Sequence, residues 1–216
     1  NYSLLLQKKL HYYRDAQLQK EWSDFGQISS LNGATVLIIG AGDIGLHYAK
    51  LVKLLGAYTI GVKRRLSEKP EYIDELYLQD KVDSLLPRAD IVAAILPGTK
   101  QTAMFFNKQR FALMKSTSFF INAGRGASVN QEDLLYALQN NIIAGASIDV
   151  TTPEPLPKDH PLWQCSNLIL TPHVAGGFHL PLTMDRIVDI ACENIINLFN
   201  HKTLKNEVDF LTGYKK

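Results

Sequence analysis

The sequence has few of the features that mark membrane, disulfide-rich or nucleic-acid-binding proteins. Its 216 residues include only 2 cysteines, Cys165 and Cys192, with neither a metal-type nor a C-x-x-C spacing, which argues against a disulfide framework and fits a reducing compartment. Apolar runs such as 36–39 and 91–96 are far shorter than the ~20 residues that span a bilayer. Lys and Arg total 23 against 21 Asp and Glu, a net charge of +2, so no basic field argues for nucleic acid. We expect a cytoplasmic globular protein whose partner is a small molecule.

Short apolar segments alternate with helix-like segments along most of the chain. Six of them predict strands, at residues 35–39, 58–62, 91–96, 118–121, 146–150 and 168–170. They are continuously apolar, as expected when helices cover both faces of a parallel sheet. The pattern therefore predicts an α/β fold, a doubly wound parallel sheet of the Rossmann type.

Helix boundaries can be predicted from capping residues. Gly56 is expected to end the helix after the first strand, Asn107 and Asn130 to cap later helices, and Pro181 to begin a last long helix that runs to about Asn200.

The two ends of the chain differ from this alternating pattern. Residues 2–22 place Leu, Tyr and Trp among Lys, Gln and Arg with roughly helical spacing, which predicts one amphipathic helix. We expect three parts: an opening interdomain helix in 1–30, a dinucleotide-binding domain in 31–178, and a C-terminal helix and tail in 179–216.

The turn Gly40-Ala41-Gly42-Asp43-Ile44-Gly45 follows the first predicted strand and precedes a helix-like segment. In that context G-x-G-x-x-G is a dinucleotide-binding motif. Gly40 permits the tight turn, Gly42 lets the backbone approach a pyrophosphate, and Gly45 lets the helix pack closely on the strand. The helix N-terminus offers amides to the phosphates. The alternative is an ordinary turn between strand and helix.

The end of the second predicted strand bears on the choice of cofactor. An acidic residue there accepts a hydrogen bond from the ribose 2′-hydroxyl of NAD, whereas a basic residue accommodates the 2′-phosphate of NADP. This chain has Lys63-Arg64-Arg65 and no carboxylate before Glu68, which favours NADP(H) over NAD(H). The alternative is a solvated basic turn in which one arginine stacks on adenine.

Later strand ends carry polar side chains, and ligands of open α/β sheets bind outside the carboxyl ends of strands. Arg125 can bind a carboxylate bidentately and polarise an adjacent carbonyl. Glu154 stands between two prolines, and His173 can donate and recover a proton near neutral pH. Each alone could be structural. Together they indicate hydride transfer at a carbonyl carbon, with the arginine orienting the oxyanion and Glu154 stabilising the imidazolium.

These segments together resemble the D-isomer-specific 2-hydroxyacid dehydrogenases, a family that includes phosphoglycerate dehydrogenases and glyoxylate/hydroxypyruvate reductases. The resemblance rests on the glycine turn, Leu96-Pro97-Gly98-Thr99, Asn122-Ala123-Gly124-Arg125-Gly126, Asp149-Val150 with Pro153-Glu154-Pro155, and Thr171-Pro172-His173. It implies that Arg125 binds the substrate carboxylate and carbonyl, that Glu154 and His173 deliver the proton, and that Asp149 meets the nicotinamide carboxamide.

The residue patterns and the resemblance together predict a set of cofactor contacts, and no metal is expected. The predicted contacts are Gly40, Gly42, Asp43, Ile44, Gly45, Lys63, Arg64, Arg65, Leu96, Pro97, Ala123, Gly124, Arg125, Asp149, His173, Ala175 and Gly176. Two residues depart from the family pattern. Lys63 stands where NAD-preferring members usually carry an acidic residue, and Gly124 replaces the common serine, alanine or threonine, for which the sequence offers no reason.

The expected function is an NAD(P)-dependent oxidoreductase, with NADPH favoured, that acts on a small 2-oxo or D-2-hydroxy acid. One alternative is a non-catalytic dinucleotide sensor of the C-terminal-binding corepressor type, and another is a hydrolase that holds NAD tightly. Members of the family begin with roughly a hundred residues of a second domain that this sequence lacks, so we expect a fragment that binds cofactor but turns over poorly. A homodimer is expected by analogy.

Overall fold

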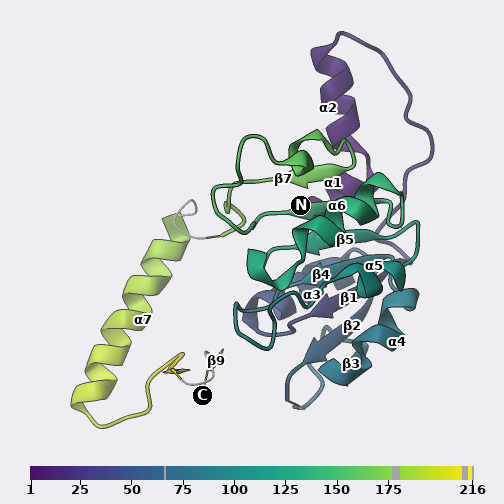
Figure 1. The fold of residues 1–216 in the computed structure, drawn as a ribbon. Coiled ribbons are helices and arrows are strands. Elements are labelled where there is room, and N and C mark those ends of the chain that lie inside the picture. The colour runs from purple at the N-terminus through teal and green to yellow at the C-terminus, as the bar shows by residue number, and fades with distance from the viewer. Residues whose placement is uncertain (66, 177–180, 211–213, 216) are drawn as a thin grey trace. The chain divides into compact units, whose positions relative to one another are not determined.

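The computed structural model describes residues 1–65, 67–176, 181–210 and 214–215 (Figure 1). These residues form two compact units, 1–171 and 172–216, and each is described by itself. The predicted division at 178/179 lies outside the described residues, and the three-part organisation stays a prediction.

Within the described part of the first unit, seven parallel strands form one sheet in the order β3-β2-β1-β4-β5-β6-β7 (Figure 1). The strands are β1 Thr35–Ile39, β2 Tyr58–Lys63, β3 Glu75–Leu78, β4 Ile91–Ala94, β5 Phe119–Asn122, β6 Gly145–Ile148 and β7 Leu168–Leu170. The strand order reverses between β1 and β4, which is the position where Rossmann sheets bind ligands. The predicted doubly wound fold is confirmed.

Short helices connect the strands, and the predicted caps are confirmed. The α-helices are α1 Tyr2–Gln7, α2 Leu10–Leu18, α3 Asp43–Leu54, α4 Val82–Leu85, α5 Lys108–Ala112 and α6 Gln131–Gln139, and the 3-10 helices are η1 Gln79–Lys81, η2 Leu86–Arg88, η3 Gly126–Ser128 and η4 Pro161–Gln164. The Asn107 side chain accepts from an amide at the start of α5, and Asn130 does so for α6. Gly56, with φ +88°, follows the end of α3.

Alternate side chains of β1 belong to two separate cores, one on each face of the sheet. Leu37 belongs to a cluster that includes Phe111 of α5 and Leu134 of α6. Val36 belongs to a second cluster, which includes Leu6 of α1. Because both faces are covered, the inner strands are apolar on both sides, which explains their continuous apolar runs.

The predicted number of six strands was wrong, because β3 was missed. Its sequence, Glu75-Leu76-Tyr77-Leu78, does not form a continuous apolar run, and all four residues are only partly buried. The strand lies at the edge of the sheet, where it pairs with β2 alone. A strand with one neighbour is less enclosed, so it lacks the pattern that identified the inner strands.

The predicted single opening helix was also wrong. Residues 2–22 contain two helices, and the chain breaks between them at Lys9, which adopts a left-handed conformation with φ 55°. Leu6 of α1 is 1% exposed in the sheet core, whereas Leu18 at the end of α2 is 61% exposed. The first turns bind the sheet and the rest of the segment leaves it.

In the second unit, α7 spans Pro181–Phe199, which confirms the predicted last helix and its first residue. Val208–Asp209 (β8) pairs antiparallel with Tyr214–Lys215 (β9). This small ribbon was not predicted.

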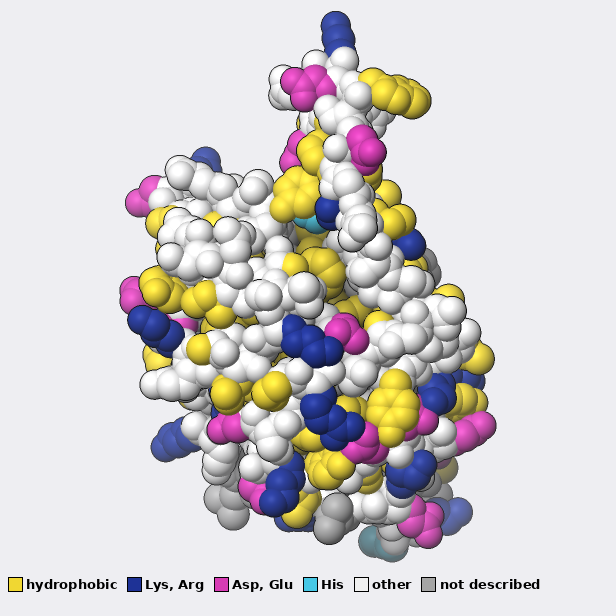
Figure 2. All heavy atoms as spheres, turned by 90° about the vertical axis from the view of Figure 1, so that its right-hand side faces the viewer, with side chains coloured by type: hydrophobic (Ala, Val, Ile, Leu, Met, Phe, Trp, Pro, Cys, Tyr) yellow, Lys and Arg dark blue, Asp and Glu magenta, His cyan; other side chains and the backbone are white. Residues whose placement is uncertain are grey.

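The molecular surface carries both signs of charge. Figure 2 shows Lys and Arg side chains interspersed with Asp and Glu on one face. That face presents no extended field of one sign. No helix in the described part of the chain has the length and apolarity needed to cross a membrane.

Phe106 lies at the centre of an aromatic cluster, and we expect its truncation to be costly. Its side chain is 0% exposed, and its ring centroid lies 4.6 Å from that of Phe120 and 6.0 Å from that of Phe111. Phe106→Ala should lower the free energy of unfolding, measured by urea denaturation, by about 3–5 kcal/mol. Leu54→Ala, at a 70% exposed position of α3, should change it by less than about 0.5 kcal/mol. Similar losses in the two variants would contradict the assigned core.

Candidate cofactor and substrate site

Backbone hydrogen bonds continue past the strand ends and join the predicted site segments of the first unit at one edge of the sheet. The amides of Gly40 and Ala41 both donate to Val62 O, at 3.1 and 3.0 Å. Beyond β1 and β4, Ile95 N donates to Ile39 O at 2.8 Å and Ala123 N donates to Ala94 O at 3.2 Å. Beyond β5 and β6, Asp149 N donates to Asn122 O at 3.0 Å and Thr171 N donates to Ile148 O at 3.1 Å. These segments therefore form a contiguous row along the carboxyl edge of the sheet.

The three glycines of the turn have different surroundings. Gly40 has φ +100°, and a Cβ there would lie 2.2 Å from Ile95 O. A Cβ on Gly45 would lie 2.3 Å from Gly40 O. These contacts confirm the tight turn and the close packing predicted for the two residues. At Gly42 a Cβ would meet nothing within 4 Å, so the space beside it is open.

The open space lies at the start of α3. Gly42 is the N-cap residue of this 12-residue helix and provides no side-chain cap to its first amides. Unpaired amides and the helix dipole favour an anion at such a position. Asp43 and Ile44, which follow Gly42, are exposed. The turn thus fits the pyrophosphate of a dinucleotide.

The basic run Lys63-Arg64-Arg65 begins beside this turn, because the preceding residue, Val62, accepts the hydrogen bonds of Gly40 and Ala41. Lys63 is half-buried at the end of β2, and its Nζ donates to Ser67 Oγ at 2.9 Å. Arg64 and Arg65 are exposed. The cations therefore lie along the edge that the glycine turn occupies.

Arg125 lies in a loop that is fixed by its neighbours. Asn122 accepts from Gly124 N at 3.1 Å and donates to Arg125 O at 3.2 Å, and Ser128 Oγ donates to the same carbonyl at 2.7 Å. The exposed guanidinium donates to Gly124 O at 2.8 Å. A rigid backbone thus presents a planar cation at the sheet edge.

The glycines on both sides of Arg125 are required by close backbone contacts. A Cβ on Gly124 would lie 2.6 Å from both the N and the O of Leu96, and one on Gly126 would lie 2.0 Å from Thr151 O. The first contact explains the glycine at position 124, for which the sequence offered no reason. The second brings the Arg125 loop against the segment that carries Glu154.

Glu154 and His173 belong to different units of the structure. Glu154 is exposed, and its Oε1 accepts from Thr151 N at 3.0 Å, so the Arg125 and Glu154 loops are neighbours. His173, with φ 56°, belongs to the second unit, as do Ala175 and Gly176. Their position relative to the first unit is not determined.

Sequence reasoning missed two residues that contact Asp149. This carboxylate, 3% exposed, follows β6 and is hydrogen-bonded by the hydroxyls of Tyr2 and Thr171. Thr171 could have been noticed because it precedes Pro172-His173, but no local signal connects Tyr2 with a residue 147 positions away.

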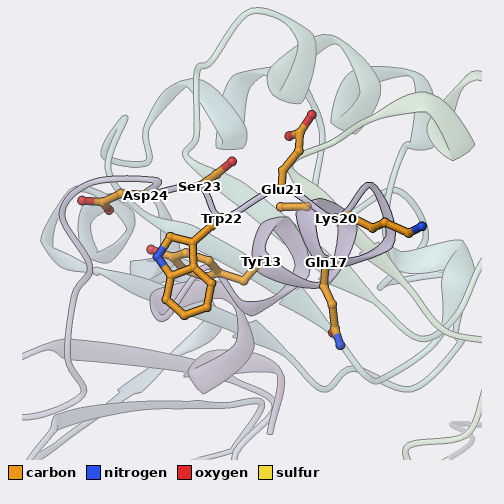
Figure 3. Close-up of a pocket in the computed structure, with 8 residues that line it drawn as sticks. Tyr13, Gln17, Lys20, Glu21, Trp22, Ser23 and Asp24 are labelled. Carbon is orange, nitrogen blue, oxygen red and sulfur yellow. The ribbon is translucent and has the colours of Figure 1, made fainter.

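A cleft of about 790 Å³ opens elsewhere, between α2 and the segment that follows it (Figure 3). It is lined by residues 13, 16, 17 and 20–24, and none of them is a predicted site residue. Among the described residues, no group of three or more His, Cys, Asp or Glu side chains could hold a metal ion.

The strand order and the open glycine turn define a Rossmann-type dinucleotide-binding protein. Residues 2–175 match the model of the "D-isomer specific 2-hydroxyacid dehydrogenase, NAD binding domain". The chain belongs to this family, and the resemblance predicted from its motifs is confirmed.

Individual relatives support the same assignment. An uncharacterised protein of Corynebacterium melassecola is 36% identical over 97% of this chain and 70% of its own length. The glyoxylate/hydroxypyruvate reductase B of Enterobacter sp. (strain 638) is 36% identical over 83% of this chain and 55% of its own. A solved structure of the NADPH-dependent glyoxylate/hydroxypyruvate reductase of Sinorhizobium meliloti, in complex with NADP and sulfate, has a TM-score of 0.86 at 30% identity and covers 98% of this chain and 66% of that one. The chain thus spans about half to two thirds of the length of these two reductases.

Two glycine variants should separate binding from packing in the turn. Gly42→Ala fills the open space, so it should weaken NADPH binding at least tenfold while changing the free energy of unfolding by less than about 1 kcal/mol. Gly45→Ala overpacks α3 on the turn, so it should cost about 1–3 kcal/mol of stability. Fluorescence titration and urea denaturation measure the two effects. Unchanged NADPH affinity in Gly42→Ala would contradict the assigned phosphate position.

Proposed function

We propose that the chain forms the cofactor-binding part of an oxidoreductase that transfers a hydride between NADP(H) and a small 2-oxo or D-2-hydroxy acid. The observation that carries this proposal is the row of segments along the carboxyl edge. Backbone hydrogen bonds join the glycine turn to Val62, which the basic run follows, and join the strand ends onward to the Arg125 loop. The Enterobacter and Sinorhizobium relatives, both named as glyoxylate/hydroxypyruvate reductases, support the reaction class.

The preference for NADP(H) rests on residues 63–65. A 2′-phosphate adds negative charge where an NAD-specific site has a carboxylate, so cations at the end of β2 favour the phosphorylated cofactor. The relative solved with NADP supports this choice.

In the proposed mechanism, Arg125 binds the substrate carboxylate and stabilises the negative charge that develops on the carbonyl oxygen. His173 donates a proton to that oxygen, and Glu154 stabilises the imidazolium. Asp149 orients the nicotinamide through its carboxamide. The bound nicotinamide supplies the hydride. The glycine turn holds the pyrophosphate, and Pro97 lies on the adenosine side. Ala123, Gly124, Ala175 and Gly176 line the nicotinamide.

We further propose a homodimer that acts in the cytoplasm. Free thiols at Cys165 and Cys192 fit a reducing compartment. The alternative of a non-catalytic sensor has no support from these relatives, which are named as reductases.

A charge reversal at the end of β2 tests the cofactor preference. Lys63→Glu should weaken NADPH binding at least tenfold and leave NADH binding unchanged or tighter, because the new carboxylate repels a 2′-phosphate but can accept from a 2′-hydroxyl. Lys81→Glu, an equal change of net charge at an exposed lysine of η1, should alter neither affinity by more than twofold. Isothermal titration at one ionic strength gives both constants. A parallel loss for NADH and NADPH would contradict the role of Lys63.

The proton donor is tested by replacing His173 in the complete oxidoreductase of which this chain forms the cofactor-binding part. His173→Ala should lower the rate of reduction of glyoxylate and hydroxypyruvate about 10²- to 10⁴-fold, a far larger factor than any loss of NADPH affinity. His201→Asn, which replaces the histidine after α7, should turn over normally. Steady-state kinetics across a panel of 2-oxo acids measures this, and undiminished turnover in His173→Ala would overturn the assignment. A complete oxidoreductase, with its substrate domain, that binds NADPH but reduces no 2-oxo acid would overturn the proposed reaction.

A further inference from the structure

Three oxygen atoms from distant parts of the chain meet at the end of β6. Thr171 Oγ1 donates to Asp149 Oδ1 at 2.6 Å. The Tyr2 hydroxyl lies 2.7 Å from Thr171 Oγ1 and 3.1 Å from the same Asp149 oxygen. Tyr2 comes from α1, Asp149 follows β6 and Thr171 follows β7. The contact thus joins the opening helix to two neighbouring strand ends.

The distances between the three oxygen atoms indicate which hydroxyl donates its proton to which oxygen. The shortest contact assigns the Thr171 proton to the Asp149 carboxylate. Thr171 Oγ1 then accepts from the Tyr2 hydroxyl, whose longer contact with Asp149 is secondary. Burial raises the pKa of the Tyr2 phenol, and the nearby negative charge of Asp149 adds to this effect, so the phenol keeps its proton. The order of donation is Tyr2 to Thr171 to Asp149.

This network stabilises a carboxylate where water is scarce. Asp149 is 3% exposed, and an ionised group at such a position is costly unless hydrogen bonds compensate it. The Thr171 hydroxyl, which donates to Asp149 and is itself oriented by Tyr2, also restricts the rotation of the carboxylate. Tyr2 is itself held firmly, because Leu6 anchors α1 in the core and Ser3 Oγ lies 2.7 Å from the Tyr48 hydroxyl.

We propose that Tyr2 and Thr171 are positioning residues, which fix the Asp149 carboxylate in the orientation that receives the nicotinamide carboxamide. This inference rests on the proposed function, in which Asp149 contacts that carboxamide. A carboxylate whose rotation is restricted presents a defined acceptor to the carboxamide NH₂ and would thereby fix the orientation of a bound nicotinamide. α1 thereby takes part in orienting the cofactor, although it lies far in sequence from every motif of the site.

The test compares two cofactors that differ only in the group that meets Asp149. NADP⁺ carries a carboxamide that donates a hydrogen bond, whereas 3-acetylpyridine adenine dinucleotide phosphate carries an acetyl group that cannot. Calorimetric titration of Tyr2→Phe and Thr171→Val should show NADP⁺ affinity reduced about two- to tenfold, the effect of one hydrogen bond. The affinity for the acetyl analogue should stay unchanged. Thr171→Ser, which keeps the hydroxyl, should restore NADP⁺ binding.

Tyr48→Phe is the matched control, since it removes a tyrosine hydroxyl that contacts α1 at Ser3 and not at Asp149. It should leave the ratio of the two affinities as in the unmodified chain. Equal losses for both cofactors in Tyr2→Phe, or the same selective loss in Tyr48→Phe, would overturn the inference. Because the readout is binding, it does not depend on turnover. If the protein reduces no 2-oxo acid but Tyr2→Phe still loses affinity for NADP⁺ alone, the proposed reaction is wrong and the inference about Tyr2 and Thr171 holds.

Discussion

Backbone hydrogen bonds beyond the strand ends determine where the site segments of the first unit lie. In a parallel sheet every strand ends at the same edge, and here pairing continues by one or two residues into each following loop. The glycine turn is thereby joined to the start of the basic run, and the Arg125 loop is joined to Asp149. Lys63, Arg125 and Asp149 thus follow strand ends whose backbone positions the sheet dictates.

Close backbone packing gives these loops their precision. Gly124 and Gly126 bring Arg125 between the backbones of Leu96 and Thr151, where any larger residue would displace the loop. Gly42 differs, because its surroundings are empty. Small residues therefore serve two purposes at this edge. Some allow protein segments to pack together, and one leaves room for a ligand.

Much of this arrangement could be predicted from local patterns. The β1 and β7 boundaries agree with their apolar runs, and the caps at Asn107 and Asn130 follow from side-chain chemistry. The edge strand β3 was missed because it pairs on one side only. The break at Lys9 was missed because the helical spacing of apolar residues continues across it.

The candidate site shows the same limit. Its motifs lie at strand ends and could be found from residue types, whereas the Tyr2 contact joins residues 147 and 169 positions apart. The reason for Gly124 could not be predicted either, because it lies in the backbone of another loop. Such features depend on tertiary packing, which no short segment encodes.

The central claim is that the dinucleotide binds along the carboxyl edge of the sheet. Amide hydrogen exchange measured with and without NADPH tests this claim most directly. The account predicts slower amide exchange in residues 40–45, 96–98 and 122–126, with no change at the opposite edge in residues 31–35 and 86–90. Protection confined to residues 13–24, around the cleft beside α2, with unchanged exchange in residues 40–45, would contradict it.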